Sequence, residues 1–77
     1  MTLADEIKHR LIHQFEDAVI ALTDTGGGDH WHLEISTKHL EGLSRVKQHQ
    51  AIYKPLQDLI AANRIHALQI VVNPAPA

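Results

Sequence analysis

Apolar side chains change their spacing twice along this chain of 77 residues, and these changes set the order of its elements. Between residues 3 and 15 they recur every four positions, as on one face of an α-helix. Between residues 31 and 35 they alternate with polar side chains, the period of a strand that is buried on one side. Helical spacing returns between residues 46 and 60. The sequence therefore predicts a helix, a strand region and a second helix.

The first helix has a readable start. Thr2 and Asp5 have the spacing of a capping box, in which each side chain accepts a hydrogen bond from the other residue's backbone. The expected buried stripe is formed by Leu3, Ile7, Leu11 and Phe15, with Ile12 beside them. We expect this helix to run to about Asp17.

Two strands and a turn are predicted next. Residues 19–25 are β-branched and apolar at first and polar later, and residues 26–29 (GGGD) form a flexible turn. A hairpin at this turn makes the two strands antiparallel. The second strand is expected to bury Trp31, Leu33 and Ile35 and to expose His32, Glu34 and Ser36.

The second helix follows a break at Glu41-Gly42, with Ser44 as its cap. Its expected inner side consists of Val46, His49, Tyr53, Leu56 and Ile60. Pro55 conflicts with a continuous helix, because proline removes one backbone hydrogen bond. Either the helix kinks near Tyr53 or a new helix starts with Pro55 in its first turn. Residues 65–72 are predicted to form the third strand.

The element order is α-β-β-α-β, which predicts an α+β fold of one domain, residues 1–72, with a short tail at 73–77. A right-handed crossover through the second helix makes strands two and three parallel. We expect a three-stranded mixed sheet with both helices on one face. This order is similar to that of KH-like nucleic-acid-binding domains, but their GxxG backbone clamp is missing here.

Composition narrows the function classes. Without cysteine the chain has no disulfide and no thiolate nucleophile or ligand. Its first 20 residues do not resemble a signal peptide, and no apolar stretch approaches the ~20 residues of a membrane span, so we expect a cytoplasmic protein. Residues 1–38 carry three basic and seven acidic side chains, whereas residues 39–77 carry four basic and two acidic ones. The second half thus has a mildly basic character suited to an acidic partner.

The sequence does not match the motifs of known catalytic sites. Ser44 lies in no nucleophile-elbow motif, and the triglycine at 26–28 is followed by neither a Lys-Ser/Thr pair nor a helix start. The carboxylates are scattered along the helices. We therefore expect no enzyme activity.

Seven histidines are the remaining chemical feature. His9 and His13 have a metal-binding spacing on a helix, but no third ligand accompanies them. His30 precedes the second strand and His66 begins the third. If these strands are parallel neighbours, both histidines lie at the same end of the sheet, with strands ~4.8 Å apart. They are the best candidates for metal ligands, with the triglycine loop giving His30 freedom to move.

Two segments resemble the BolA family. Leu40–Tyr53 reads LEGLSRVKQHQAIY, similar to that family's signature, and Arg64–Leu68 reads RIHAL, similar to the segment that carries its C-terminal histidine. The sequence GDHWHLEI places His30 where the His-loop class has its loop histidine. The resemblance implies that His30 and His66 bind a [2Fe-2S] cluster shared with a monothiol glutaredoxin. The cysteine of that partner and its bound glutathione would supply the other ligands.

Alternative functions stay open at this point. The resemblance also allows a DNA-binding transcription regulator that uses the second helix and the Glu41-Gly42 turn, and a homodimer when the protein is alone. Residues 48–50 (QHQ) are less basic than in many relatives, which weakens the DNA reading. An interaction domain without metal is a third reading. Arg45, Lys47 and Arg64 are the expected contacts to a partner or to nucleic acid.

Overall fold

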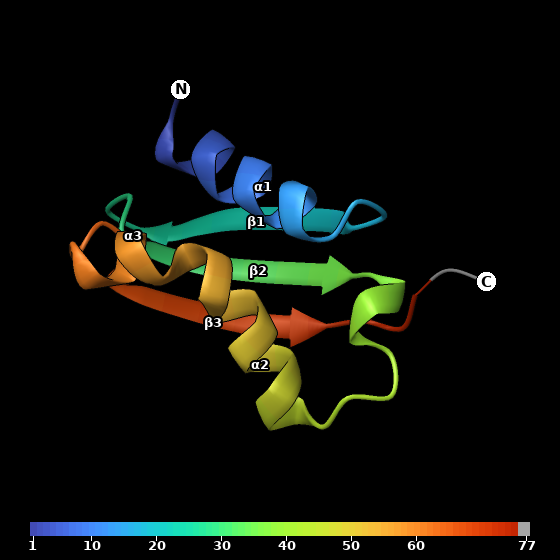
Figure 1. Ribbon diagram of the computed structural model, residues 1–77. Helices are drawn as coiled ribbons and strands as arrows, with labels where there is room; N and C mark the ends of the chain where they lie inside the picture. Colours follow the sequence, from blue (N-terminus) through green and yellow to red (C-terminus); the bar gives the residue numbers. More distant parts are fainter. Residues whose placement is uncertain (76–77) are drawn as a thin grey trace.

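The computed structural model of the protein describes residues 1–75, and the predicted tail at 73–77 therefore lies partly outside the described residues. The elements follow the predicted α-β-β-α-β order, with short 3₁₀ turns between them (Figure 1). They are α1 (Leu3–Gln14), β1 (Val19–Gly26), β2 (His30–Ser36), η1 (Lys38–Leu40), α2 (Arg45–Tyr53), η2 (Lys54–Leu56), α3 (Gln57–Ala61) and β3 (Ala67–Val72).

The strands form one mixed sheet in the order β1-β2-β3. β1 and β2 are antiparallel, with Val19 opposite Ser36, and the register shifts between Asp24 and Gly26 next to the turn. β2 and β3 are parallel, with His30 opposite Ala67. The predicted hairpin, the predicted parallel pairing of the second and third strands and the α+β fold class are thus confirmed.

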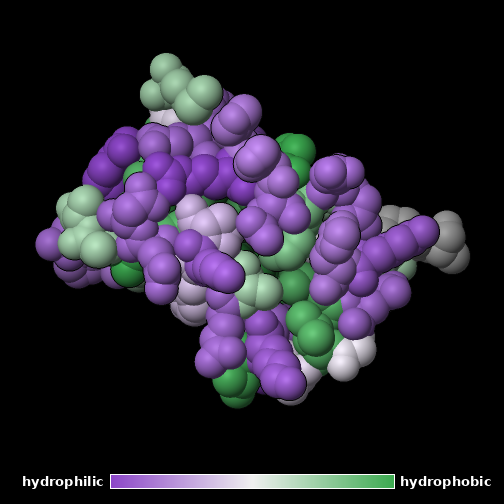
Figure 2. All heavy atoms as spheres, in the orientation of Figure 1, coloured by the Kyte–Doolittle hydropathy of each residue, from purple (hydrophilic) through white to green (hydrophobic). Residues whose placement is uncertain are grey.

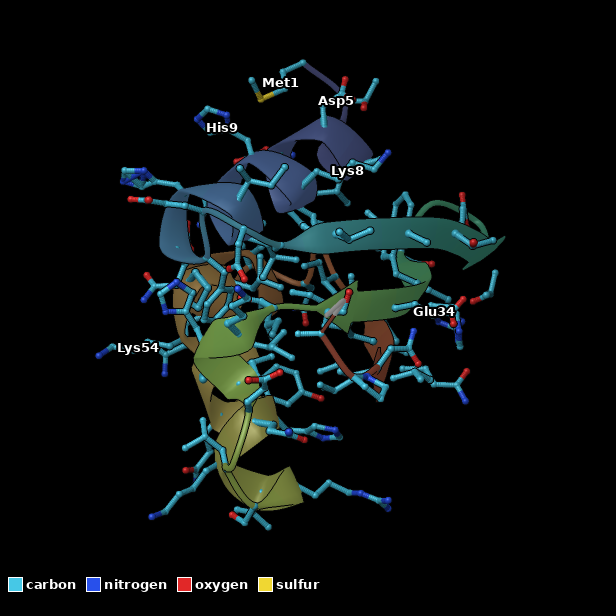
Figure 3. The ribbon with its side chains drawn as sticks, turned by 90° about the vertical axis from the view of Figure 1, so that its right-hand side faces the viewer. Met1, Asp5, Lys8, His9, Glu34 and Lys54 are labelled. Carbon is cyan, nitrogen blue, oxygen red and sulfur yellow. The ribbon has the colours of Figure 1, made fainter. Side chains whose placement is uncertain are left out.

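All helices cover the same face of the sheet, as predicted (Figure 1). The core lies between the two layers, and the opposite sheet face carries Glu34 directed away from the helices (Figure 3). The core contains side chains from the stripe of α1, from the inner face of β2 and from the inner side of the second helical region. Its buried members are Ile7, Leu11, Phe15, Trp31, Leu33, Ile35, Leu40, Ile52, Leu56, Leu59 and Ile65.

The start of α1 confirms the capping box, because Thr2 Oγ1 accepts from the Asp5 backbone N–H and the Asp5 carboxylate accepts from the Thr2 N–H. The end of the helix differs from the prediction. The helix stops at Gln14 because Phe15 is already extended, with φ −128° and ψ 93°, and its ring enters the core. Ile12 does not join the buried stripe and is 47% exposed.

The second helical region is split rather than kinked. Ser44 caps α2 as predicted, and Pro55 lies in the first turn of η2, after which α3 begins. The predicted inner side is wrong at Val46, which is 67% exposed, and at Tyr53, which is exposed too. The first turns of α2 extend past the β3 edge of the sheet, so they have no sheet beneath them (Figure 1). Ile52 is the buried residue of α2 instead.

Two strand predictions also need correction. Ser36 was expected in solvent but is buried, as is the next residue, Thr37, which is only 2% exposed. β3 begins at Ala67, two residues later than predicted, so His66 lies just before the strand. At the other end, the Asn73 backbone N–H still donates to Ile35 O at 2.9 Å, so the sheet contact continues into the predicted tail.

Candidate metal-ligand site

The main chain brings His30 and His66 to one end of the sheet. β2 starts at His30, and β3 starts beside it in parallel register. The backbone carbonyl of Asp29 accepts two hydrogen bonds, from the His66 N–H at 2.7 Å and from the Ala67 N–H at 3.2 Å. The separation of the two histidines is therefore set by backbone groups that lie between them in space.

Their side chains lie against each other. The imidazole rings of His30 and His66 are stacked, with centroids 5.5 Å apart and planes inclined by 27°. Both residues are exposed, and the His30 side chain keeps 49% of its surface in solvent. The Asp29 carboxylate lies nearby, with its Oδ1 at 3.9 Å from His30 Nε2. A metal or a partner protein can reach both rings from outside without opening the core.

The loop before His30 is held by hydrogen bonds to an aspartate side chain. Asp24 Oδ1 accepts from the backbone N–H of Gly26 at 2.9 Å and from that of Gly28 at 3.2 Å. Gly27 and Gly28 both have positive φ, 70° and 81°, a conformation that glycine adopts without steric cost. Asp24 was not among the predicted site residues. An aspartate two residues before a glycine turn is a known loop-forming signal that was available in the sequence.

Trp31 fixes the strand directly behind His30. Its side chain is 7% exposed and packs in the core, opposite Leu68 of β3 in the sheet register. Among the described residues, its indole Nε1 is buried without a hydrogen-bond partner. The large buried ring keeps the start of β2 in place while the neighbouring imidazole stays in solvent.

The other histidines do not build a metal site. Within residues 1–75, no group of three or more His, Cys, Asp or Glu side chains is arranged to hold a metal ion. His9 projects from α1 into solvent (Figure 3). His32 is hydrogen-bonded to Gln69 Oε1 at 3.1 Å on the open sheet face, and His39 lies with its Nε2 3.7 Å from Asp17 Oδ1. His49 is half-buried on α2.

The three predicted contact cations do not gather around the histidines. Arg64 lies two residues before His66, and its Nη2 is 3.1 Å from Glu6 Oε2 of α1. Arg45 and Lys47 lie at the start of α2, where Arg45 faces the last residues of β3. Only Arg64 is therefore placed to contact a partner that covers the histidine end.

The donor set suits a shared cluster better than a complete site of its own. A [2Fe-2S] cluster takes four ligands, and histidine replaces cysteine in known clusters. This end of the sheet offers two imidazoles, and a fold without cysteine offers no thiolate. The residues fit a cluster whose remaining ligands come from a second molecule. A charged group bound at the two imidazoles would lie near the Asp29 carboxylate.

Sheet order, helix placement and the exposed histidine pair define a small α+β domain of the α-β-β-α-β class, with its polar site at one end of a parallel strand pair. The sequence profile described as "BolA-like protein" matches residues 3–75. The chain therefore belongs to the BolA-like family. The predicted resemblance is confirmed.

Individual relatives agree with this assignment. The acid stress protein IbaG of Escherichia coli is 44% identical over 46 residues, which are 60% of this chain and 55% of that protein. The chain thus spans about half the length of that relative. The uncharacterized protein RP812 of Rickettsia prowazekii is 34% identical over 68 residues, 87% of each chain.

Solved structures show the same fold. The BolA domain of SufE1 from Arabidopsis thaliana superposes with a TM-score of 0.81 at 28% identity, covering 91% of this chain and 88% of that one. The NMR structure of RP812 superposes with a TM-score of 0.72, and the match covers 95% of each chain.

Within the described residues, no helix combines the length and the apolar character needed to cross a membrane.

Proposed function

We propose that this protein is a non-enzymatic partner of a monothiol glutaredoxin, and that His30 and His66 contribute two ligands to a shared [2Fe-2S] cluster. The observation that carries the proposal is the exposed, stacked histidine pair at the end of the sheet, with ring centroids 5.5 Å apart. Membership of the BolA-like family supports it. The role fits iron–sulfur cluster trafficking or iron and redox regulation in the cytoplasm.

The ligand chemistry suits such a role. Imidazole binds as the neutral form, so its bond to iron competes with protonation near physiological pH. Clusters with histidine ligands also have higher reduction potentials than all-cysteine clusters. Two solvent-facing imidazoles are therefore ligands that a cluster can leave or exchange, as transfer or sensing requires. Arg64, two residues from His66, is the cation that we expect to contact the glutaredoxin.

Co-expression with a monothiol glutaredoxin tests the proposal. We expect a coloured heterodimer whose visible absorption and circular dichroism differ from those of the glutaredoxin homodimer. His30→Ala and His66→Ala should each change the circular dichroism spectrum and speed cluster loss. His32→Ala is the matched control, because His32 lies two residues from His30 on the same strand but bonds to Gln69 on the open face.

The results of these experiments distinguish cluster binding by the two histidines from an interaction domain without metal. Spectra that are unchanged in both His30→Ala and His66→Ala would remove these residues as ligands. A glutaredoxin that binds equally well with and without cluster would favour an interaction domain without metal. Equal effects of all three substitutions would indicate a general loss of structure, which far-ultraviolet circular dichroism of the free variants detects.

Nucleic-acid binding is the weaker candidate. The cations expected to contact DNA do not share one surface, because Arg64 pairs with Glu6 while Arg45 and Lys47 lie at the start of α2. The formal net charge is −2. Phosphate contacts make affinity fall steeply with salt, so gel-shift titration at two salt concentrations tests this role. We expect no specific shift at low salt.

A further inference from the structure

The outer edge of β3 carries unused backbone hydrogen-bonding groups. In its parallel register with β2, the N–H groups of Ala67 and Asn73 donate to Asp29 and Ile35. The alternation of a parallel ladder therefore directs the N–H and C=O groups of Leu68, Ile70 and Val72 away from β2. None of the hydrogen bonds formed within residues 1–75 outside the strand ladders uses these groups.

This edge lacks the usual protection. Exposed edge strands are normally guarded by lysine, proline, a bulge or a covering segment, because an open edge can pair with another chain. β3 reads ALQIVV, with no charge and no proline, and its pairing with β2 shows no register shift. Val71, on the open face, is 37% exposed. The edge is therefore suited to accept a strand.

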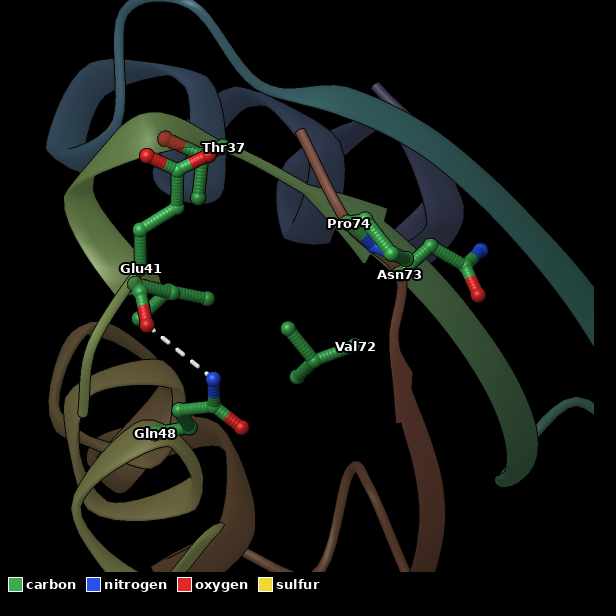
Figure 4. A pocket seen from close by; sticks show the side chains of 7 residues that line it. Thr37, Glu41, Gln48, Val72, Asn73 and Pro74 are labelled. Atoms are coloured by element: carbon green, nitrogen blue, oxygen red, sulfur yellow. Dashed lines mark hydrogen bonds between the residues drawn. The ribbon is translucent and has the colours of Figure 1, made fainter. Parts of the chain in front are cut away.

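A groove runs beside the C-terminal half of this edge. It encloses about 360 Å³ between the overhanging start of α2 and β3, and its lining is Arg45, Gln48, His49, Ile70, Val71 and Val72. A neighbouring hollow of about 220 Å³ shares Gln48 and Val72 with it. Figure 4 shows these two side chains across the hollow, where Gln48 Nε2 donates to the Leu40 carbonyl at 3.0 Å. That bond fixes the position of one wall.

The chemistry of the groove selects its occupant. Ile70, Val71 and Val72 of β3 line one side of the groove, and the cation Arg45 lies on the other. The first turn of α2 contains no acidic residue, so its helix dipole adds to this positive charge. Hydrophobic atoms are exposed on this side of the molecule beside hydrophilic ones (Figure 2), in agreement with the exposure of Leu43 and Val46.

We propose that this groove binds an extended segment of a partner protein, which adds to β3 as a fourth strand and places an acidic side chain beside Arg45. Strand addition obtains affinity from main-chain hydrogen bonds and specificity from pockets for alternate side chains. A second copy of this chain fits less well. It would bring its own α2 over the same edge and its own Arg45 toward the first.

This binding surface goes beyond the proposed glutaredoxin role. His66 precedes β3, whereas the groove accompanies its last three residues, so the two sites lie toward opposite ends of a strand of six residues. Such a strand is ~20 Å long. A partner could therefore occupy the groove while the histidine end is covered, and peptide binding does not require His30 or His66.

An NMR titration of the ¹⁵N-labelled cluster-free protein tests the proposal. The probe is the synthetic peptide acetyl-DDVTVTVDD-amide, and the control is the same peptide with lysine in place of aspartate. We expect chemical-shift changes at the amides of Leu68, Ile70 and Val72 below ~1 mM aspartate peptide. Hydrogen exchange of these three amides should slow at least about tenfold, because they become paired. The amides at 69 and 71 are already paired and should change little.

Charge-reversal variants locate the site. Arg45→Glu should weaken binding about tenfold or more. Lys47→Glu makes the same charge change in the same helical turn on another face, and it should leave affinity within about twofold. His66→Ala should bind the peptide normally.

Three results would overturn the proposal. The first is the absence of shifts at Leu68, Ile70 and Val72 at 1 mM aspartate peptide. The second is equal binding of the lysine peptide. The third is protection of these amides that rises with protein concentration in the absence of peptide, which would assign the edge to a second copy.

Discussion

At the scale of single residues, Asp17 connects two loops that are distant in the sequence. Its carboxylate accepts from the Thr37 hydroxyl, and its Oδ2 accepts from the Lys38 backbone N–H at 2.8 Å. The Thr37 hydrogen bond is the main cause that lowers the pKa of Asp17 below its ordinary value of 3.8. The ionised carboxylate thereby holds the connection after β2 against the α1–β1 turn.

The lowered pKa of Asp17 predicts how stability depends on pH. Just below pH 3.8 the unfolded chain binds a proton that the folded protein does not, so this stabilisation is present above that pH. It is lost as the pH falls through the folded-state pKa. Asp17→Asn should lower the free energy of unfolding at pH 7 and flatten its decline in acid. Urea denaturation at pH 7 and at several values below 4 measures both effects.

Glu16→Gln provides the control for Asp17→Asn, because the neighbouring exposed carboxylate forms none of these hydrogen bonds. It should leave the acid slope close to that of the unaltered protein. An unchanged slope in Asp17→Asn would show that the carboxylate does not stabilise the fold in its ionised form.

The juxtaposition of His30 and His66 was predictable because parallel pairing of two readable strands requires it. Among the contacts that support the pair, the Asp24 turn had a signal in the sequence, an aspartate two residues before a glycine, but the Asp29 contacts had none. The Asp29 carbonyl accepts from the backbone N–H groups of His66 and Ala67, and no side-chain pattern reveals which N–H groups a loop carbonyl will meet. The same holds for Asp17, whose partners lie 20 and 21 positions away.

At the scale of elements, the α2–α3 region shows where spacing misleads. The predicted stripe from Val46 to Ile60 used one helical spacing across Pro55, where η2 interrupts the helix. The start of α2 also passes beyond the sheet, so helical position there carries no information about burial (Figure 1). In β2, by contrast, alternation identified Trp31, Leu33 and Ile35 correctly.

The overhang of α2 predicts a difference between two apolar truncations in the same helix. Ile52 is fully buried, so Ile52→Ala should lower the free energy of unfolding by about 2–5 kcal/mol. Val46→Ala removes a side chain that is 67% exposed, and it should change stability by less than about 0.5 kcal/mol. Urea denaturation of both variants measures the difference. A similar loss in both would mean that the start of α2 is packed.

At the scale of the whole molecule, the two proposed sites occupy different parts of a body that measures 35 × 21 × 20 Å. The histidine pair lies where β2 and β3 begin, and the groove lies where β3 ends. Sites separated by more than ~7–10 Å without shared contacts usually act additively. The structure therefore predicts two independent binding events.

A double-mutant cycle of His66→Ala and Arg45→Glu checks this independence. We expect His66→Ala to affect cluster retention alone and Arg45→Glu to affect peptide affinity alone. For each quantity, the double variant should match the single variant that affects it within ~0.5 kcal/mol. Coupling larger than that would show that the sheet transmits a change from one end to the other.

The parallel pairing of β2 and β3 has a consequence for how the protein is made. The β1–β2 hairpin closes over residues 27–29, whereas partners in β2 and β3, such as His32 and Gln69, are 37 positions apart. Closing the longer loop costs more chain entropy, so the hairpin is expected to form before β3 joins it. During synthesis, His66 also leaves the ribosome after α1, β1, β2 and α2. The two imidazoles therefore meet only in a molecule whose folding is complete, and a truncated or half-folded chain presents one histidine without the other.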